Sequence, residues 1–239
     1  MPIRISERNG FNFWYCLSLL QLISTGIKKL DQILDGGIKN GIITDIFGAR
    51  GTGKTHLAMQ ISINSLQNGG TVLFQDTTGD FRPERMLEII KTRNLEPSLL
   101  ENVKVGRVTN TGEQIQYLSK IKELNNFSLI IIDNVTDLFS FEYSEELQML
   151  EKSILFMRYM HDLSLLAIQK RIPIVVTNMI RIIDKTEKEN LDKSISLFTH
   201  LKINLMKKDA KYFGEILPTF QGKRQFSYLI TKEGLVDAS

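Results

Sequence analysis

The feature that most constrains the fold of this chain is a glycine-rich octapeptide between a β-rich run and a helical run. Residues 48–55, Gly-Ala-Arg-Gly-Thr-Gly-Lys-Thr, satisfy the pattern G-x-x-x-x-G-K-[ST]. Strand-forming residues precede the octapeptide over 42–47, and apolar residues at helical spacing follow over 54–66. A strand, a glycine turn and a helix in series predict a loop whose backbone N–H groups surround an anion at a helix N-terminus.

The side chains of the octapeptide favour a nucleotide phosphate as that anion. Lys54 would supply a positive charge to the β- and γ-phosphates, and the Thr55 hydroxyl would ligate Mg²⁺. A glycine turn with an incidental lysine is the alternative, but the strand-to-helix setting favours nucleotide binding. The predicted nucleotide-binding residues of the loop are Gly48, Ala49, Arg50, Gly51, Thr52, Gly53, Lys54 and Thr55.

A second acidic site follows another strand pattern. Asp133 comes directly after the apolar run Leu129-Ile-Ile-Ile, where a carboxylate can hold the metal through water. An aspartate that caps the following segment is the alternative. Together the two motifs predict a Mg–nucleotide site at the carboxyl ends of parallel strands. On these motifs alone, a kinase, a GTPase and a RecA-type ATPase all remain open.

Strand and helix patterns alternate along the chain from residue 24. Further strands are expected over 71–75, 103–108, 128–132 and 173–177, and helices over 83–92, 111–124 and 144–170. This alternation predicts an α/β fold with a mainly parallel twisted sheet flanked by helices. Short alternating strands over 202–206, 212–217 and 225–231 predict an antiparallel C-terminal extension at one sheet edge. We therefore expect one domain over 24–239.

Composition excludes several other classes. The 239 residues are 42% hydrophobic and 24% charged with a formal net charge of +3, which is typical of a globular protein and not of a disordered one. The single Cys16 cannot form an internal disulfide, and one Cys with three His cannot supply a zinc set. A reduced, cytoplasmic location is the natural expectation.

Residues 1–23 form an apolar N-terminal extension of the predicted domain. Its apolar run over 13–23 is too short for a membrane span, so no membrane association is expected. A signal peptide would be cleaved near Ser24, where the domain already begins. We expect this extension to dock on the domain or on a neighbouring subunit, which would give self-association. An over-extended gene start is the remaining alternative.

Three further strings narrow the choice by resemblance. Ser24-Thr25-Gly26 and Gly36-Gly37 precede the glycine-rich loop, and Asp76-Thr-Thr-Gly-Asp-Phe-Arg-Pro-Glu-Arg85 follows it. From about residue 24 to the C-terminus, the chain resembles the ATPase core of the RecA/RadA recombinase superfamily. Its length is similar to that of RadB or another short archaeal RadA paralogue, since it leaves no room for the helical DNA-binding domain of RadA.

The resemblance implies a RecA-like P-loop NTPase core that uses ATP and Mg²⁺ in homologous recombination and DNA repair. The implied partners are a main RadA-type recombinase or other repair proteins. Within the site, Thr55 and Asp133 would hold the metal, Lys54 would act on the phosphates, and Arg85 would stack its guanidinium on adenine. A surface arginine on a helix is the alternative for Arg85.

Two departures from the family pattern concern catalysis. The family's catalytic glutamate occupies the third position of Asp-Thr-Glu-Gly, and that position is Thr78 here. A neutral hydroxyl is a poor general base, so its presence predicts weak or absent ATP hydrolysis unless Asp80 substitutes. The family's γ-phosphate-sensing glutamine after Thr-Asn is Met179 here, and a thioether cannot donate that hydrogen bond.

A third departure concerns DNA. The acidic run Glu142-Tyr-Ser-Glu-Glu146 stands where the family's first DNA-binding loop carries arginine, and carboxylates repel a phosphate backbone. The place of the second DNA-binding loop, residues 180–193, is mixed in charge and is expected to be a solvated loop. If DNA is bound directly, the candidate residues are Lys202, Lys207, Lys208, Lys211, Lys223 and Arg224, with a plain basic edge as the alternative.

The sequence hypothesis is an ATP-binding RadB-like accessory factor in recombinational repair. The alternative is a KaiC-like nucleotide-dependent signalling or assembly module that binds protein partners and not DNA. Salt-dependent binding to single-stranded DNA would favour the first function over the second. An active strand-exchange enzyme is disfavoured by Thr78, Met179 and the acidic run.

Overall fold

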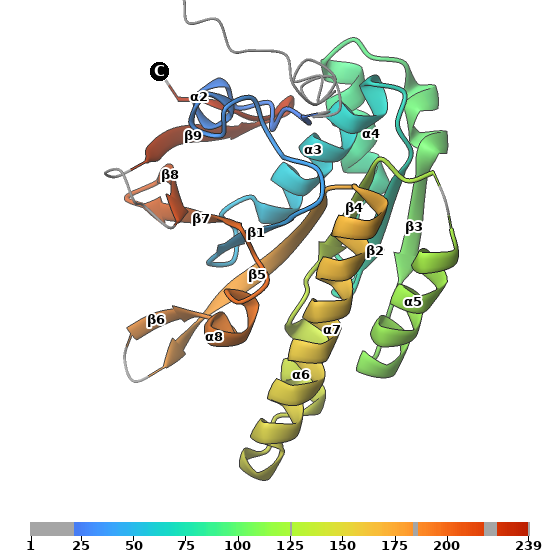
Figure 1. Ribbon diagram of the computed structural model, residues 1–239. Helices are drawn as coiled ribbons and strands as arrows, with labels where there is room; N and C mark the ends of the chain where they lie inside the picture. The colour runs from blue at the N-terminus through green and yellow to red at the C-terminus, as the bar shows by residue number, and fades with distance from the viewer. Residues whose placement is uncertain (1–21, 125, 184–185, 218–223, 239) are drawn as a thin grey trace, which may run out of the picture.

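The computed structural model describes residues 22–124, 126–183, 186–217 and 224–238, which form a layered α/β domain (Figure 1). Within these residues, ten strands form one sheet in the order β10-β9-β8-β7-β1-β5-β4-β2-β3, with β6 paired to β5 alone. The strands are β1 (Ile43–Gly48), β2 (Val72–Asp76), β3 (Val103–Arg107), β4 (Leu129–Asp133), β5 (Ile174–Ile183), β6 (Thr186–Glu189), β7 (Leu201–Lys208), β8 (Lys211–Leu217), β9 (Gln225–Thr231) and β10 (Gly234–Asp237).

Helices cover both faces of the sheet, as Figure 1 shows. They are α2 (Lys28–Ile33), α3 (Lys54–Gln67), α4 (Pro83–Thr92), α5 (Thr111–Glu123), α6 (Asp137–Glu142), α7 (Met149–Lys170) and α8 (Asp192–Ile195), with 3₁₀ turns at Pro97–Asn102 and Glu146–Gln148. The predicted α/β fold with a mostly parallel sheet is confirmed. The antiparallel part starts one strand later than expected, because β7 runs parallel to β1 before β8 turns back.

Two hydrophobic cores lie on opposite faces of the sheet. Leu129 and Ile131 of β4 belong to the core under α3 and α4, while Ile130 and Ile132 belong to the core under α5 and α7. All four side chains are fully buried. A central parallel strand buries both faces, which explains why β4 is continuously apolar up to Asp133.

The segment expected to be a solvated loop over 180–193 is a β-hairpin followed by α8, so that expectation is wrong. β5 continues to Ile183 and pairs antiparallel with β6, with Arg181 opposite Lys188. Isoleucines at 180, 182 and 183 favour extended backbone. The charged residues that flank them favour a solvated loop instead, which is why the sequence did not predict the strand. The long helix also begins later than expected, at Met149, and the short helix α6 before it was not foreseen.

Gln60 on α3 ties the two ends of the described chain together. Its side chain donates to the carbonyl oxygens of Thr25 (2.7 Å) and Leu235 (2.9 Å) and accepts from the N–H of Leu235 (2.7 Å). Ile23 is buried and pairs with Ile38. Of the predicted N-terminal extension over 1–23, residues 1–21 lie outside the described residues, so its predicted docking stays a prediction.

No helix in the described part of the chain is long and apolar enough to cross a membrane.

Candidate nucleotide site

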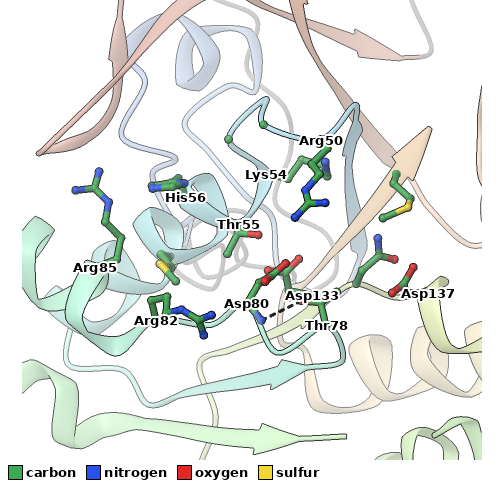
Figure 2. A pocket seen from close by; sticks show the side chains of 15 residues that line it. Arg50, Lys54, Thr55, His56, Thr78, Asp80, Arg82, Arg85, Asp133 and Asp137 are labelled. Atoms are coloured by element: carbon green, nitrogen blue, oxygen red, sulfur yellow. Dashed lines mark hydrogen bonds between the residues drawn. The ribbon is translucent and has the colours of Figure 1, made fainter. Parts of the chain in front are cut away.

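A cavity of about 670 Å³ opens where β1, β2 and β4 end, beside Met179 in the middle of β5. Strand register places Gly48 beside Met179 and Asp76 beside Asp133, so residues from distant motifs meet at this edge. Figure 2 shows Lys54, Thr55 and Asp133 near the centre, with Arg85 towards one end and Asp137 towards the other. The lining residues are Arg50, Gly51, Gly53, Lys54, Thr55, His56, Met59, Thr78, Asp80, Arg82, Arg85, Asp133, Asn134, Asp137 and Met179.

The loop between β1 and α3 needs glycine at its two ends. Gly48 has φ +152°, and a Cβ there would lie 2.1 Å from the carbonyl oxygen of Leu205. Gly53 has φ +95° and precedes the first turn of α3, so α3 begins with its N-terminus at the cavity. Free backbone N–H groups and the helix dipole both favour an anion at such a position.

Lys54 is the first residue of α3, and its half-buried side chain reaches back to this loop. Its Nζ donates hydrogen bonds to the carbonyl oxygens of Gly48 (2.9 Å) and Ala49 (2.8 Å). Burial lowers the pKa of Lys54, and the nearby Asp133 carboxylate partly offsets this effect. A cation held by two neutral carbonyls in a cavity can gain a stronger partner from a phosphate group.

Asp133 is buried and only partly hydrogen-bonded. The Thr177 hydroxyl donates to its Oδ1, whereas its Oδ2 has no hydrogen-bond partner among the described residues. Burial raises the pKa of Asp133, and the hydrogen bond from the Thr177 hydroxyl opposes the shift. A buried carboxylate oxygen without a partner, beside the Thr55 hydroxyl, fits a hydrated Mg²⁺ because such an ion keeps several waters.

The loop after β2 carries Thr78 into the cavity lining. Asp76 anchors this loop, since its Oδ1 accepts from the N–H of Gly79 (2.8 Å) and from the N–H of Thr78 (3.1 Å). The Thr78 hydroxyl also donates to that oxygen (3.2 Å) and accepts from the N–H of Asp80 (3.3 Å). The Thr78 side chain is therefore used within its own loop, while Asp80 also lines the cavity.

Arg85 reaches the cavity from α4. Its Nη2 donates to the carbonyl oxygen of Thr231 (2.5 Å), and its Nη1 forms an ion pair with Glu88. The predicted stacking on adenine would need the plane of the Arg85 guanidinium to face the cavity.

His56 and Met59, one helical turn apart on α3, line the cavity too and were missed by sequence reasoning. Their position directly after the phosphate motif was the available signal.

Met179 lines the cavity from β5, next to a buried polar network. The Asn178 side chain donates to Glu189 Oε1 (2.8 Å) and to the carbonyl oxygen of Asn190 (2.8 Å), while its Oδ1 accepts from the N–H of Met179 (2.8 Å). These hydrogen bonds fix the Asn178 side chain. The side chain that lines the cavity next to it is the thioether of Met179.

The six predicted DNA-contacting residues do not form one group. Lys202 is buried and pairs with Glu189 and with Asp192 (2.8 Å), so it is not available to a DNA backbone. The exposed residues Lys207, Lys208 and Lys211 gather at the turn between β7 and β8. Arg224 is exposed before β9, and Lys223 lies outside the described residues.

Comparison with known proteins agrees with this geometry. The model of the family described as Rad51 matches residues 18–193, a range that contains the glycine-rich loop, Asp133 and Met179. The "DNA repair and recombination protein RadB" of Pyrococcus furiosus is 33% identical over 163 residues, which cover 67% of this chain and 68% of the relative.

Proposed function

The chain belongs to the Rad51 family of the RecA/RadA recombinase superfamily, and on that basis we propose that it is an ATP-binding accessory factor in homologous recombination and DNA repair. The observation that carries the proposal is the cavity at the loop between β1 and α3. There a helix N-terminus, the Lys54 ammonium and the partnerless Asp133 oxygen face one space. This donor set matches the charge of a magnesium–nucleotide complex.

Within that site each residue has a distinct role. The backbone of residues 48–55 would surround the phosphates, and Lys54 would place its charge against them. Thr55 would ligate Mg²⁺ directly, and Asp133 would hold a metal-bound water. Arg85 would lie against the adenine ring. When bound, Mg²⁺ neutralises phosphate charge and orients the γ-phosphate.

Slow or absent hydrolysis is the second part of the proposal. Activation of the attacking water needs a base, and the hydroxyl of Thr78 is neutral and already bonded to Asp76. Met179 offers no donor that could distinguish ATP from ADP. We therefore propose that bound ATP acts mainly as a ligand that sets the state of the protein for its repair partners.

The exposed basic turn between β7 and β8 is the proposed surface for any direct DNA contact. Lys207, Lys208 and Lys211 carry three positive charges on adjacent strands. The ammonium of Lys207 lies over the ring of Tyr212, 5.4 Å from its centroid. Such contacts would be made with phosphates, so they would be independent of base sequence and weakened by salt.

Lys54→Ala is expected to weaken Mg–ATP binding by at least about tenfold, because it removes the positive charge nearest the predicted phosphates. Equilibrium binding of a fluorescent ATP analogue, with and without Mg²⁺, measures the change. Lys91→Ala, at an exposed position on α4, is the matched control and should bind as the unmodified protein does. Equal affinity of the Lys54 variant and the control would contradict the proposed site.

A further inference from the structure

The end of the α6–α7 hairpin exposes an unusual concentration of apolar side chains. Five of the ten exposed large hydrophobic residues in the described part of the chain lie within 141–154, and they are Phe141 (81% exposed), Leu147 (96%), Met149 (56%), Leu150 (73%) and Ile154 (46%). We call this set the apolar tip. In Figure 1 this end of α7 projects beyond the sheet and the other helices. A concentration of exposed apolar side chains at one end of a hairpin favours an interaction site there.

The apolar tip is not a loosely packed part of the core. Directly behind it, Phe139 of α6 packs against Phe156 of α7 with ring centroids 5.2 Å apart, and against Tyr159 at 5.6 Å. These three aromatic side chains are buried. The two helices are therefore fixed to each other by one face, while Leu150 and Ile154, one turn apart on α7, lie outside that packing.

Within residues 139–151 of the α6–α7 hairpin, all lysine, arginine, aspartate and glutamate charges are negative. Between Phe139 and Glu151 the sequence carries four glutamates and no lysine or arginine. Glu142 accepts a hydrogen bond from the N–H of Thr111 (2.8 Å). Burial raises the pKa of the Tyr143 phenol, and the neighbouring Glu151 and Glu142 carboxylates raise it further. The local potential is therefore negative.

The next basic residue along the chain is Lys152 on α7. Burial lowers the pKa of Lys152, and the Arg181 guanidinium lowers it further. The carboxylates of Glu145 and Glu151 are exposed, and residues 139–151 contain no lysine or arginine. A nucleic acid backbone would be repelled from such a surface, whereas a basic partner would be attracted.

We propose that the apolar tip docks a partner protein through a segment that combines apolar and basic side chains, such as an amphipathic basic helix. The apolar side of the segment would cover Leu147 and Leu150, and its basic side would meet Glu145 and Glu151. Buried apolar contacts would supply affinity, and the carboxylates would select the sign of charge and speed association. This surface extends the accessory role proposed above, but it does not depend on nucleotide binding.

The test uses a fluorescent synthetic helical peptide with leucines on one face and lysines on the other. Its binding to the full chain is measured by anisotropy without nucleotide, beside a peptide with the same leucines and glutamates in place of lysines. The lysine peptide should bind and the glutamate peptide should not. Leu147→Ser/Leu150→Ser and, separately, Glu145→Lys/Glu151→Lys should each weaken binding about tenfold or more.

Matched controls lie on other exposed surfaces. Leu197→Ser, at a position that is 71% exposed, and Glu96→Lys/Glu123→Lys should leave the affinity unchanged. All variants should keep the melting temperature of the unmodified protein, because the altered side chains are exposed. Failure of the lysine peptide to bind, equal binding of both peptides, or equal losses in the control variants would overturn the proposal.

Sedimentation separates a partner protein from a second copy of the chain. If Leu147→Ser/Leu150→Ser converts a dimer into a monomer, the occupant of the apolar tip is a second copy and the proposal is wrong. An unchanged sedimentation coefficient together with lost peptide binding supports it. A chain that binds the peptide but not ATP would contradict the proposed function alone.

Discussion

Thr78→Glu is expected to raise ATP turnover by roughly 10²–10⁴-fold, the contribution that a positioned general base usually makes. The Thr78 side chain lies in the loop anchored by Asp76 and lines the same cavity as Lys54 and Asp133. A carboxylate there would be placed to accept a proton from a water that attacks the γ-phosphate. Phosphate release at saturating ATP and Mg²⁺ measures the change.

Thr78→Gln is the matched control, because it has nearly the size of glutamate but cannot accept a proton. Its turnover should stay at the level of the unmodified protein. Asp80→Asn in the unmodified background tests whether Asp80 already acts as a base, and we expect it to have no effect on turnover. A Thr78→Glu variant that is no faster than Thr78→Gln, with ATP still bound, would contradict the role assigned to this position.

Lys202→Met is expected to reduce the free energy of unfolding by about 3–5 kcal/mol, the usual result of removing one partner from a buried charge cluster. Lys202 pairs with Glu189 and Asp192, and its Nζ lies 3.9 Å from Asp45, which is fully buried in β1. These neighbours raise the pKa of Lys202 against the effect of burial. Urea unfolding at neutral pH measures the loss.

The pH dependence of that loss checks its electrostatic origin. Burial raises the pKa of Asp45 well above its usual value, and the Glu189 carboxylate raises it further. A carboxyl with a raised folded-state pKa contributes stability below its unfolded pKa of about 4 and loses that contribution as the pH rises through its folded value. Without Lys202, the deficit should therefore be smallest near pH 4 and grow towards neutral pH.

Lys207→Met is the matched control for Lys202→Met, since Lys207 is an exposed lysine on the same strand. It should change the free energy of unfolding by less than about 0.5 kcal/mol. Equal losses for the two variants, or a Lys202→Met deficit that does not vary with pH, would contradict the assignment of Lys202 to a buried cluster.

Local patterns predicted the parallel part of the fold well. The apolar run of β4 and the proline at the start of α4 are local signals, and both elements lie where the sequence indicated. The hairpin of β5 and β6 was missed because its charges suggested a loop. Its register is fixed by the pairing of β6 with β5 and by the hydrogen bond from Asn178 to Glu189, and these cross-strand contacts leave no local sequence pattern.

The candidate site also has residues that the sequence predicted and residues that it did not. The phosphate loop is contiguous in sequence, so its shape and its helix could be predicted directly. Lys202 was instead grouped with basic residues by sequence position, although it lies next to acidic side chains from β1 and β6. His56 and Met59 reach the cavity only because α3 presents one face to it, which depends on how that helix packs.

The most direct test of the proposed function is one measurement of ATP binding and ATP hydrolysis on the same purified protein, with and without single-stranded DNA. Mg²⁺-dependent ATP binding should be clear, and hydrolysis should be slow and not stimulated by DNA, because Thr78 supplies no general base. Robust turnover stimulated by single-stranded DNA would contradict the proposal that bound ATP serves here as a ligand.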